Sequence, residues 1–228
     1  MKKILLASAL VLAIAVSAAV AQEVLSQNAV GYIKVNLPAN KFVSVAQPLN
    51  NMGKAENKFG ETSIAQEAPV GTYVFFWSPE GQGWSGGVKA GGTKGWAPGQ
   101  SNRVVAAGEG FFLKSPVDTE VTITGEVPDE AQLTRTIPGN GAFGALANPY
   151  PVDFKFGESD AAKNASIGSY AFFWSIDGQG WSGGVKAGGT KGWAGGQSNR
   201  VVQAGEGFFL KEAEGVTTIT TVKPYTWP

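Results

Sequence analysis

The chain has 228 residues, of which 32 are Gly, and it contains neither His nor Cys. This excludes acid–base catalysis and catalytic triads that depend on His, thiol nucleophiles, disulfides, and zinc sites built on His or Cys. Lys plus Arg and Asp plus Glu number 18 each, so the charge gives no sign of a nucleic acid partner.

Residues 1–21 have the pattern of a signal peptide. Two lysines at the start are followed by an apolar run up to Val16 and by the small-x-small triplet Ala-Val-Ala, so we expect cleavage after Ala21. The apolar run is shorter than the roughly 20 residues of a membrane span. We therefore predict an exported protein, located in the periplasm, on the cell surface or outside the cell, with no transmembrane span in the mature chain.

The rest of the chain contains an internal repeat. Residues 71–114 and 168–211 differ at six of 44 aligned positions, with a constant offset of 97. The flanks match more weakly, at offsets of 96 to 101. The pattern predicts two tandem homologous units of about 100 residues, 22–128 and 129–228, a length that suits small independent domains.

Short apolar runs between Gly- and Pro-rich turns predict β-strands in each unit. In the first unit these runs are Tyr32–Leu37, Lys41–Val45, Thr72–Trp77, Arg103–Ala106, Gly110–Lys114 and Val121–Thr124. The second unit has an equivalent set. The helices that we expect are short, namely Met52–Phe59 and Glu158–Asn164, the latter with Ser159 as N-cap. The pattern predicts an all-β fold in which each unit is a β-sandwich or a small barrel.

Two segments match the G-x-G-x-x-G pattern of nucleotide-binding loops. They are 81–86 and 178–183, each directly after a predicted strand. A phosphate site would also need a helix to follow. The next residues, 87–96 in the first unit, are too rich in Gly to hold a helix. We therefore interpret each segment as a long β-hairpin loop.

Paired carboxylates are the remaining route to hydrolysis without His, as in glycoside hydrolases. The acidic positions shared by both units are Glu61 and Glu158, Glu80 and Asp177, and Glu109 and Glu206. The exchange of Glu80 for Asp177 moves a carboxylate by one methylene, and Glu109 can pair with Arg103 instead. We predict a non-enzymatic protein without cofactor or metal, with a carboxylate-based glycoside hydrolase as a remote alternative.

The Trp residues of the Gly-rich segments are the main candidates for ligand contact. These are Trp84 and Trp96 in the first unit and Trp181 and Trp193 in the second, with Arg103 and Arg200 as candidate hydrogen-bond donors. Flat apolar rings beside amides and hydroxyls can stack on sugar rings, although the same rings can also cap a thin core. An acidic polymer would suit the nearby basic residues Lys89, Lys94, Lys186 and Lys191. Trp77 and Trp174 end predicted strands, so we expect them in the core.

The order of three sequence blocks resembles that of a group of bacterial proteins. The blocks are Asn148–Pro151, Tyr170–Trp174 and Ala204–Lys211. They resemble the β-rich repeat modules of secreted, surface-associated bacterial proteins that carry NPYP…W…GxGFFVK-type blocks. Ser26–Lys34 is similar to the mature start of exported proteins of Verrucomicrobia-like bacteria. The resemblance implies export and an all-β module, and it brings no catalytic residue.

Two functions follow from these observations. We expect first a structural or interaction protein of the cell surface or the extracellular matrix, with itself or other surface proteins as partners. The reason is that apolar strands in small units leave edges that can pair between molecules. The alternative is a bivalent, lectin-like protein that binds polysaccharide through its two Trp-bearing loops, because tethering two weak sites raises avidity.

Overall fold

A computed structural model of the chain describes residues 29–91, 95–97, 99–188 and 191–226. The predicted signal peptide lies outside the described residues. Within them, no helix is both long enough and apolar enough to cross a membrane. Residues 29–128 are called the first half below, and residues 129–226 the second half.

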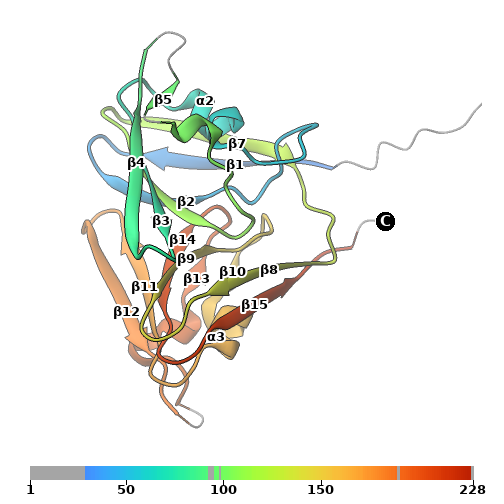
Figure 1. Cartoon of the computed structure of the whole chain (residues 1–228), viewed down its shortest axis with the longest axis vertical. Helices are drawn as coiled ribbons and strands as arrows, with labels where there is room; N and C mark the ends of the chain where they lie inside the picture. The colour runs from blue at the N-terminus through green and yellow to red at the C-terminus, as the bar shows by residue number, and fades with distance from the viewer. Residues whose placement is uncertain (1–28, 92–94, 98, 189–190, 227–228) are drawn as a thin grey trace, which may run out of the picture.

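The fold is all-β, as predicted (Figure 1). The strands of the first half are β1 (Val30–Leu37), β2 (Phe42–Ala46), β3 (Tyr73–Ser78), β4 (Gly83–Lys89), β5 (Trp96–Ala97), β6 (Gly110–Lys114) and β7 (Thr119–Glu126). Those of the second half are β8 (Gln132–Ile137), β9 (Phe143–Ala147), β10 (Phe154–Lys155), β11 (Tyr170–Ser175), β12 (Gly180–Val185), β13 (Val201–Val202), β14 (Gly207–Lys211) and β15 (Thr217–Val222).

Each half is sandwich-like, with a larger antiparallel sheet facing a two-stranded ribbon. The sheet of the first half has the order β2-β6-β3-β4-β5 and faces the ribbon β1-β7. The sheet of the second half has the order β12-β11-β14-β9 and faces the ribbon β8-β15, with β10 and β13 forming a further short pair. Both ribbons are antiparallel, with Val35 of β1 opposite Val121 and Arg135 of β8 opposite Ile219.

The two halves have separate hydrophobic cores. The first is built around Phe59, Phe76 and Phe111, and the second around the equivalent rings of Phe156, Phe173 and Phe208. Ring centroids within the first trio are 5.1 to 5.6 Å apart, and those within the second are 5.1 to 5.7 Å apart. The segment around Pro128 joins β7 to β8, where the sequence places the boundary between the two units. The division into two domains stays a prediction.

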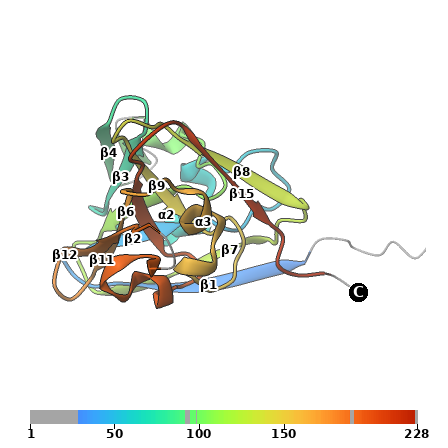
Figure 2. The ribbon, with the colours of Figure 1, turned by 90° about the horizontal axis from the view of Figure 1, so that it is seen from below.

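Short helices close the cores. They are η1 (Phe59–Glu61), α2 (Ser63–Glu67), η3 (Gln100–Asn102), η4 (Phe156–Glu158), α3 (Asp160–Asn164) and η6 (Ala194–Asn199). Ser159 is the N-cap of α3, as predicted, and its Oγ accepts a hydrogen bond from the Ala162 N–H at 3.1 Å. Figure 2 shows α3 close to the ribbon that contains β15.

The helix predicted over Met52–Phe59 was wrong. This segment forms turns and bends, because Gly53 has a left-handed φ of 65° and Met52 is exposed rather than packed. The α-helix begins later, after Thr62, whose side chain accepts a hydrogen bond from the Ala65 N–H. Residues Arg103–Ala106 were also predicted as a strand, whereas only Val104 makes a bridge there.

The Gly-rich segments predicted as long loops are mainly strands. Residues 79–82 make the turn, and β4 then pairs with β3 over its whole length. Gly is needed in β4 because β5 approaches its backbone closely: a Cβ atom on Gly87 would lie 1.7 Å from the Ala97 carbonyl oxygen. Gly184 has the same relation to Ala194 in the second half. The high Gly content therefore reflects close packing of backbones rather than an open loop.

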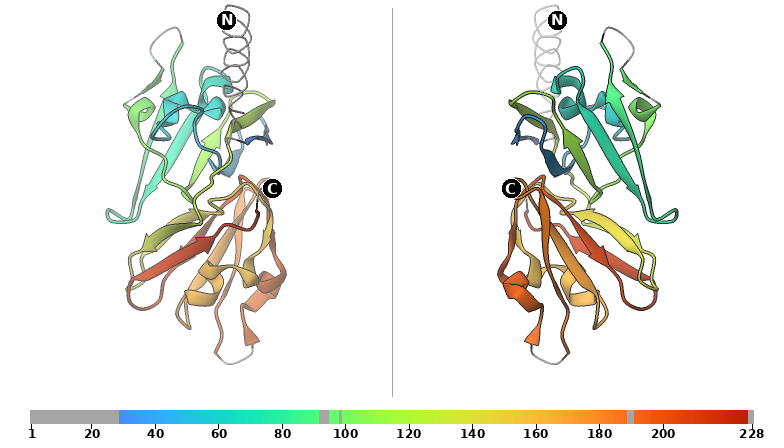
Figure 3. Two further views of the ribbon diagram at one scale, coloured as in Figure 1. Left: turned by 90° about the vertical axis from the view of Figure 1, so that its right-hand side faces the viewer. Right: turned by 90° about the vertical axis from the view of Figure 1, so that its left-hand side faces the viewer.

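The two halves lie against each other (Figure 3), and the cluster of side chains between their sheets is mainly aromatic. The rings at this contact are Phe42, Phe75, Trp77, Phe112, Phe143, Phe172, Trp174 and Phe209. The Trp77 indole N–H donates to the Phe143 carbonyl at 2.8 Å, and the Trp174 indole N–H donates to the Phe42 carbonyl at 2.8 Å. Trp77 and Trp174 therefore join the two halves instead of lying in the core of either, which corrects the prediction.

Each hairpin tip reaches across to the opposite half through a Gln side chain. Gln82 Oε1 accepts from the Phe143 N–H at 2.8 Å, and its Nε2 donates to the Phe143 carbonyl at 3.1 Å. Gln179 makes the same pair of bonds with Phe42, at 2.8 and 3.2 Å. Both Gln residues have a left-handed backbone, with φ of 46° and 44°. The hydrogen bonds of the two side-chain amides thus hold each Gln in a backbone conformation that this residue rarely adopts.

The inner sheet edges are covered by reciprocal pairing between the halves. The Ala46 N–H of β2 donates to the Gly205 carbonyl at 2.8 Å, and the Ala147 N–H of β9 donates to the Gly108 carbonyl at 2.9 Å. Because β2 and β9 are the edge strands of their sheets, this pairing removes two edges that would otherwise be open to another molecule.

Replacing Gln82 by Ala should lower the free energy of unfolding by roughly 2–3 kcal/mol, because two hydrogen bonds are lost and Ala keeps the strain of a positive φ. Gln82→Gly should cost about 1 kcal/mol less, since Gly tolerates that φ. Urea unfolding measures both changes. The control is Gln66→Ala on the exposed surface of α2, and equal, small losses for all three variants would contradict the bridging role.

Candidate functional site

Trp84 and Trp181 lie together where the two halves meet. The Trp84 ring centroid is 5.6 Å from that of Phe112 and 5.5 Å from that of Phe209. Trp181 contacts the same two rings, at 5.7 and 5.3 Å. Trp84 is 47 % exposed and Trp181 44 % exposed, so much of each side chain is open to solvent. These four residues are called the aromatic patch below.

The strands next to the patch hold its two Trp side chains in place. Trp84 stands opposite Trp77 across the β3–β4 pair, with ring centroids 5.1 Å apart. Trp181 stands opposite Trp174 in the same way, at 5.0 Å. Since Trp77 and Trp174 are themselves fixed by hydrogen bonds to the opposite half, the exposed rings rest on a rigid base.

A shallow apolar groove extends from the patch along β3 and β4 of the first half. Its residues are Tyr73, Phe75, Trp84, Gly86, Gly87, Val88 and Ala97. Tyr73 stacks on Phe75, with centroids 6.2 Å apart and an angle of 14° between the rings. A Cβ atom on Gly86 would lie 2.9 Å from the Phe75 ring, so Gly keeps this ring uncovered. Tyr170 and Phe172 form the equivalent stack in the second half.

Trp96 and Trp193 do not belong to this surface. They are 4 % and 5 % exposed, and each packs edge-on against the central Phe of its core. The Trp96 indole N–H donates to the Ala65 carbonyl at 3.2 Å, and Trp193 donates to the Ala162 carbonyl at 3.3 Å. Their rings have no face open to a ligand, so the two candidates are withdrawn from the predicted site.

Arg103 and Arg200 lie over the cores, away from the aromatic patch. The Arg103 guanidinium stands 4.4 Å from the centroid of the Phe76 ring and pairs with Glu109 at 2.5 Å. Arg200 is placed in the same way, over Phe173 and paired with Glu206 at 2.5 Å. The structure therefore does not bring either Arg together with the exposed Trp side chains.

Two of the basic residues considered for ligand binding, Lys89 and Lys186, bind carbonyl groups at the ends of the α-helices. Lys89 Nζ donates to the carbonyls of Gln66 and Ala68, both at 2.6 Å, at the end of α2. Lys186 Nζ does the same at the end of α3. Burial lowers the pKa of both ammonium groups. Lys191 is exposed, and Lys94 lies outside the described residues.

The acidic residues considered for catalysis take part mainly in ion pairs. Glu109 is buried, and besides Arg103 it accepts a hydrogen bond from the Ala106 N–H at 3.0 Å. Glu61 lies 3.8 Å from Lys54. Among the described residues, no group of three or more acidic side chains is placed to hold a metal ion. These pairings give no support to a pair of catalytic carboxylates.

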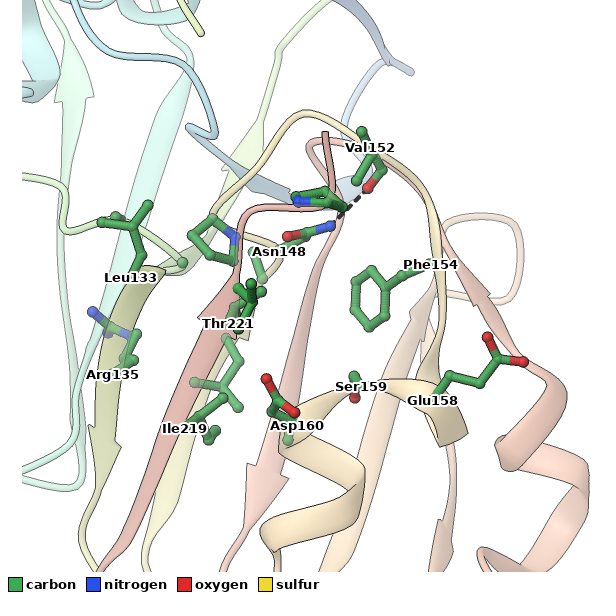
Figure 4. Close-up of a pocket in the computed structure, with 18 of the residues that line it drawn as sticks. Leu133, Arg135, Asn148, Val152, Phe154, Glu158, Ser159, Asp160, Ile219 and Thr221 are labelled. Atoms are coloured by element: carbon green, nitrogen blue, oxygen red, sulfur yellow. Dashed lines mark hydrogen bonds between the residues drawn. The ribbon is translucent and has the colours of Figure 1, made fainter. Parts of the chain in front are cut away.

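A cavity of about 580 Å³ lies in the second half, between α3 and the β8–β15 ribbon (Figure 4). Its inner wall is apolar and includes Leu133, Phe154 and Ile219, while Glu158 and Asp160 project at its rim. We call it the α3 pocket. The sequence analysis did not predict the α3 pocket. The pocket exists because some side chains of the repeat are smaller in the second copy, and the sequence alone does not show which of these side chains face the same space.

The first half fills the equivalent space. Ile64 of α2 is fully buried there, whereas Ala161 stands at the equivalent position of α3. In addition, Ser63 and Glu67 of α2 accept hydrogen bonds from backbone N–H groups of β7, at 2.7 and 2.6 Å. In the second half Asp160 stands at the position of Ser63, and it lines the pocket. The second half therefore keeps open space between its helix and its ribbon.

Scans of protein-family models, of curated proteins and of solved structures gave no match to this chain.

The repeat offers a matched test of the α3 pocket. Ala161→Ile adds the side chain of the first half, and filling the pocket should raise the free energy of unfolding by about 1 kcal/mol. Ile64→Ala creates the corresponding cavity in the first half and should lower the free energy of unfolding by about 2–5 kcal/mol. Chemical denaturation measures both. A marked loss of stability in Ala161→Ile would contradict the equivalence of the two positions.

Proposed function

We propose that this protein is exported and binds neutral polysaccharide, without catalysis, through the aromatic patch. The observation that carries the proposal is that Trp84 and Trp181, from different halves, are both partly exposed and both contact the rings of Phe112 and Phe209. Flat, rigid aromatic rings stack on the apolar faces of sugar rings at little cost in side-chain entropy. The exported state rests on the pattern of residues 1–21 alone.

A single composite surface is favoured over two separate sites. The sequence suggested a bivalent protein with one Trp loop for each unit, but both rings contact Phe112 and Phe209. In this proposal one glycan chain stacks on both rings at once. Such a surface gains affinity from a second contact within one ligand rather than from two independent ligands.

The neutral class of glycan is favoured by the positions of the charged side chains. Lys89 and Lys186 are bound to helix carbonyls, and Arg103 and Arg200 to carboxylates. The cations nearest the aromatic contact are Lys114 and Lys211, which lie over the rings of Phe42 and Phe143 at 5.2 and 5.4 Å. The exposed rings of Trp84 and Trp181 are surrounded mainly by Gly and by other aromatic groups.

Self-association, which the sequence favours, receives less support. That expectation rested on unpaired strand edges. The edges of β2 and β9 are covered by Gly205 and Gly108 of the opposite half. In this proposal a structural role at the cell surface consists of attachment of the protein to a polysaccharide.

Soluble neutral polysaccharides should produce a saturable change in Trp fluorescence of the protein that begins at Gln22. Trp84→Ala and Trp181→Ala should each weaken binding by about tenfold or more, because one stacking contact is worth at least ~1.4 kcal/mol. Each variant's fold is checked by circular dichroism and by its urea midpoint.

Tyr32→Ala serves as the matched control, because Tyr32 is an aromatic side chain exposed on β1, outside the patch. It should bind as the original protein does. A folded Trp84→Ala variant that binds with unchanged affinity would refute the role of the patch. Tighter binding to acidic than to neutral polysaccharides would refute the assignment of ligand class.

A further inference from the structure

The strand β15 has an open edge. Beyond its end, the Lys223 N–H donates to the Ala131 carbonyl at 2.9 Å, in register with the pairing of β15 and β8. Only alternate residues of an antiparallel pair bond to the partner strand, so the N–H and carbonyl groups of Thr218, Thr220 and Val222 point away from β8. Within the described part of the chain, β15 pairs with β8 alone, and these outward groups have no hydrogen-bond partner.

The equivalent edge of β7 in the first half is closed. The N–H groups of Thr122 and Thr124 donate to side chains of α2, at 2.6 and 2.7 Å. Further along, the N–H and the carbonyl of Glu126 pair with the backbone of Asn50, at 2.8 and 2.9 Å. All three outward N–H groups of β7 therefore have an acceptor within the chain.

The second copy of the repeat lacks these partners. In the alignment of the two copies, Ser63 is replaced by Asp160, Glu67 by Asn164 and Asn50 by Pro151. Pro has no backbone N–H, so residue 151 cannot form the pair that Asn50 makes. Asp160 lines the α3 pocket and does not bond to β15. The two copies thus differ at each position that closes the edge.

The α3 pocket runs along the open edge of β15. The strand lines it with Ile219, Thr221 and Val222. Figure 4 shows α3 and the segment that holds Phe154 on the side of β15 away from β8. An unpaired strand edge beside an apolar cavity provides the two features that a peptide needs to join a sheet: main-chain hydrogen bonds and room for alternate side chains.

The charged side chains around the α3 pocket favour a basic occupant. Three acids and two bases line it. Of the bases, Lys155 lies 3.5 Å from Glu158, and Arg135 lies on β8, across β15 from α3 in Figure 4. On the α3 side, Asp153 and Asp160 are left without an ion pair to any described residue.

We propose that the α3 pocket binds an extended peptide segment of a partner protein, which pairs with the outer edge of β15 as a third strand of the ribbon. Alternate side chains of the segment are apolar and enter the pocket. The side chains between them are basic and face the acidic rim with Asp153 and Asp160. The backbone of the segment bonds to Thr220 and Val222, as Asn50 bonds to β7. The proposal is independent of glycan binding by the aromatic patch.

Calorimetric titration with the synthetic peptide acetyl-KVKVKVK-amide tests the proposal. We expect saturable binding of one peptide per chain. The isomer acetyl-KKVVVKK-amide has the same composition, but its apolar side chains no longer share one face, so it should bind about tenfold more weakly. The acidic peptide acetyl-EVEVEVE-amide should bind several-fold more weakly than the basic one, because the rim of the pocket repels it.

Two N-methylated forms of the alternating peptide test for main-chain pairing. One carries methyl groups on the three Val nitrogens, and the other on the Lys nitrogens at positions 3 and 5. A strand bonds to one edge through alternate residues, so one form should lose about tenfold in affinity while the other keeps it. The unmethylated peptide should also slow amide hydrogen exchange at Thr220 and Val222.

The repeat supplies a matched variant of the protein. Asp160→Ser, Ala161→Ile and Asn164→Glu together give α3 the residues with which α2 closes the first half, and they should abolish peptide binding. Val222→Pro removes an outward N–H that β8 does not use, so the variant keeps its fold and should bind several-fold more weakly. Tyr32→Ala, on the exposed face of β1, is the control and should bind as the original protein does.

The proposal is overturned if the alternating peptide does not bind, or if both N-methylated forms bind equally well. Unchanged affinity in the triple variant and in Val222→Pro, each shown to be folded by circular dichroism, would overturn it as well. Equal affinity for the acidic and basic peptides would refute the basic character of the partner. Dimerisation of the protein that the peptide reverses would identify a second copy as the occupant and refute the choice of a separate partner.

Discussion

The contact between the aromatic faces of the two sheets is the constraint on which the rest of the structure depends. Each sheet uses one face for its own core and the other for the opposite sheet, so neither aromatic face is left to solvent as a whole. Burying such rings contributes about 2–3 kcal/mol each, which small sandwich-like halves need because their cores are thin. The hydrogen bonds of Trp77 and Gln82 to Phe143 then fix the orientation of the halves.

This contact also determines where a ligand can bind. It brings Trp84 and Trp181, from hairpins that lie far apart in the sequence, to the same pair of Phe rings, and it leaves both Trp side chains partly uncovered. The near identity of residues 71–114 and 168–211 has a physical consequence here, because both copies contribute to the same contact.

Differences between the copies are as informative as their identity. The repeat is weak at the ribbon and at the α-helix. At these places the two halves differ in how much of the space between the elements their side chains fill. Ala161 in place of Ile64 leaves the α3 pocket open. This opening therefore has a filled counterpart in the same molecule, which shows what shape the space accepts.

Most of the fold could be predicted from the sequence, because alternating and continuous apolar runs mark strands such as Tyr32–Leu37 directly. The site could be predicted only in part. Trp84 and Trp96 both lie in Gly-rich segments, and only the pairing of β4 with β3 reveals that one is exposed and the other buried. No sequence pattern marked Gln82 as a residue that joins the two halves, because its hydrogen-bond partner Phe143 is 61 residues away.

The most direct test of this account is a nuclear Overhauser experiment on aromatic protons of the protein that begins at Gln22. The account predicts cross-peaks between the halves, from Trp84 to Phe209 and from Trp181 to Phe112, whose ring centroids lie 5.5 and 5.7 Å apart. Cross-peaks confined to pairs within one half, such as Trp84 with Trp77, would show that the sheets do not meet as described. They would also remove the basis for a composite binding surface.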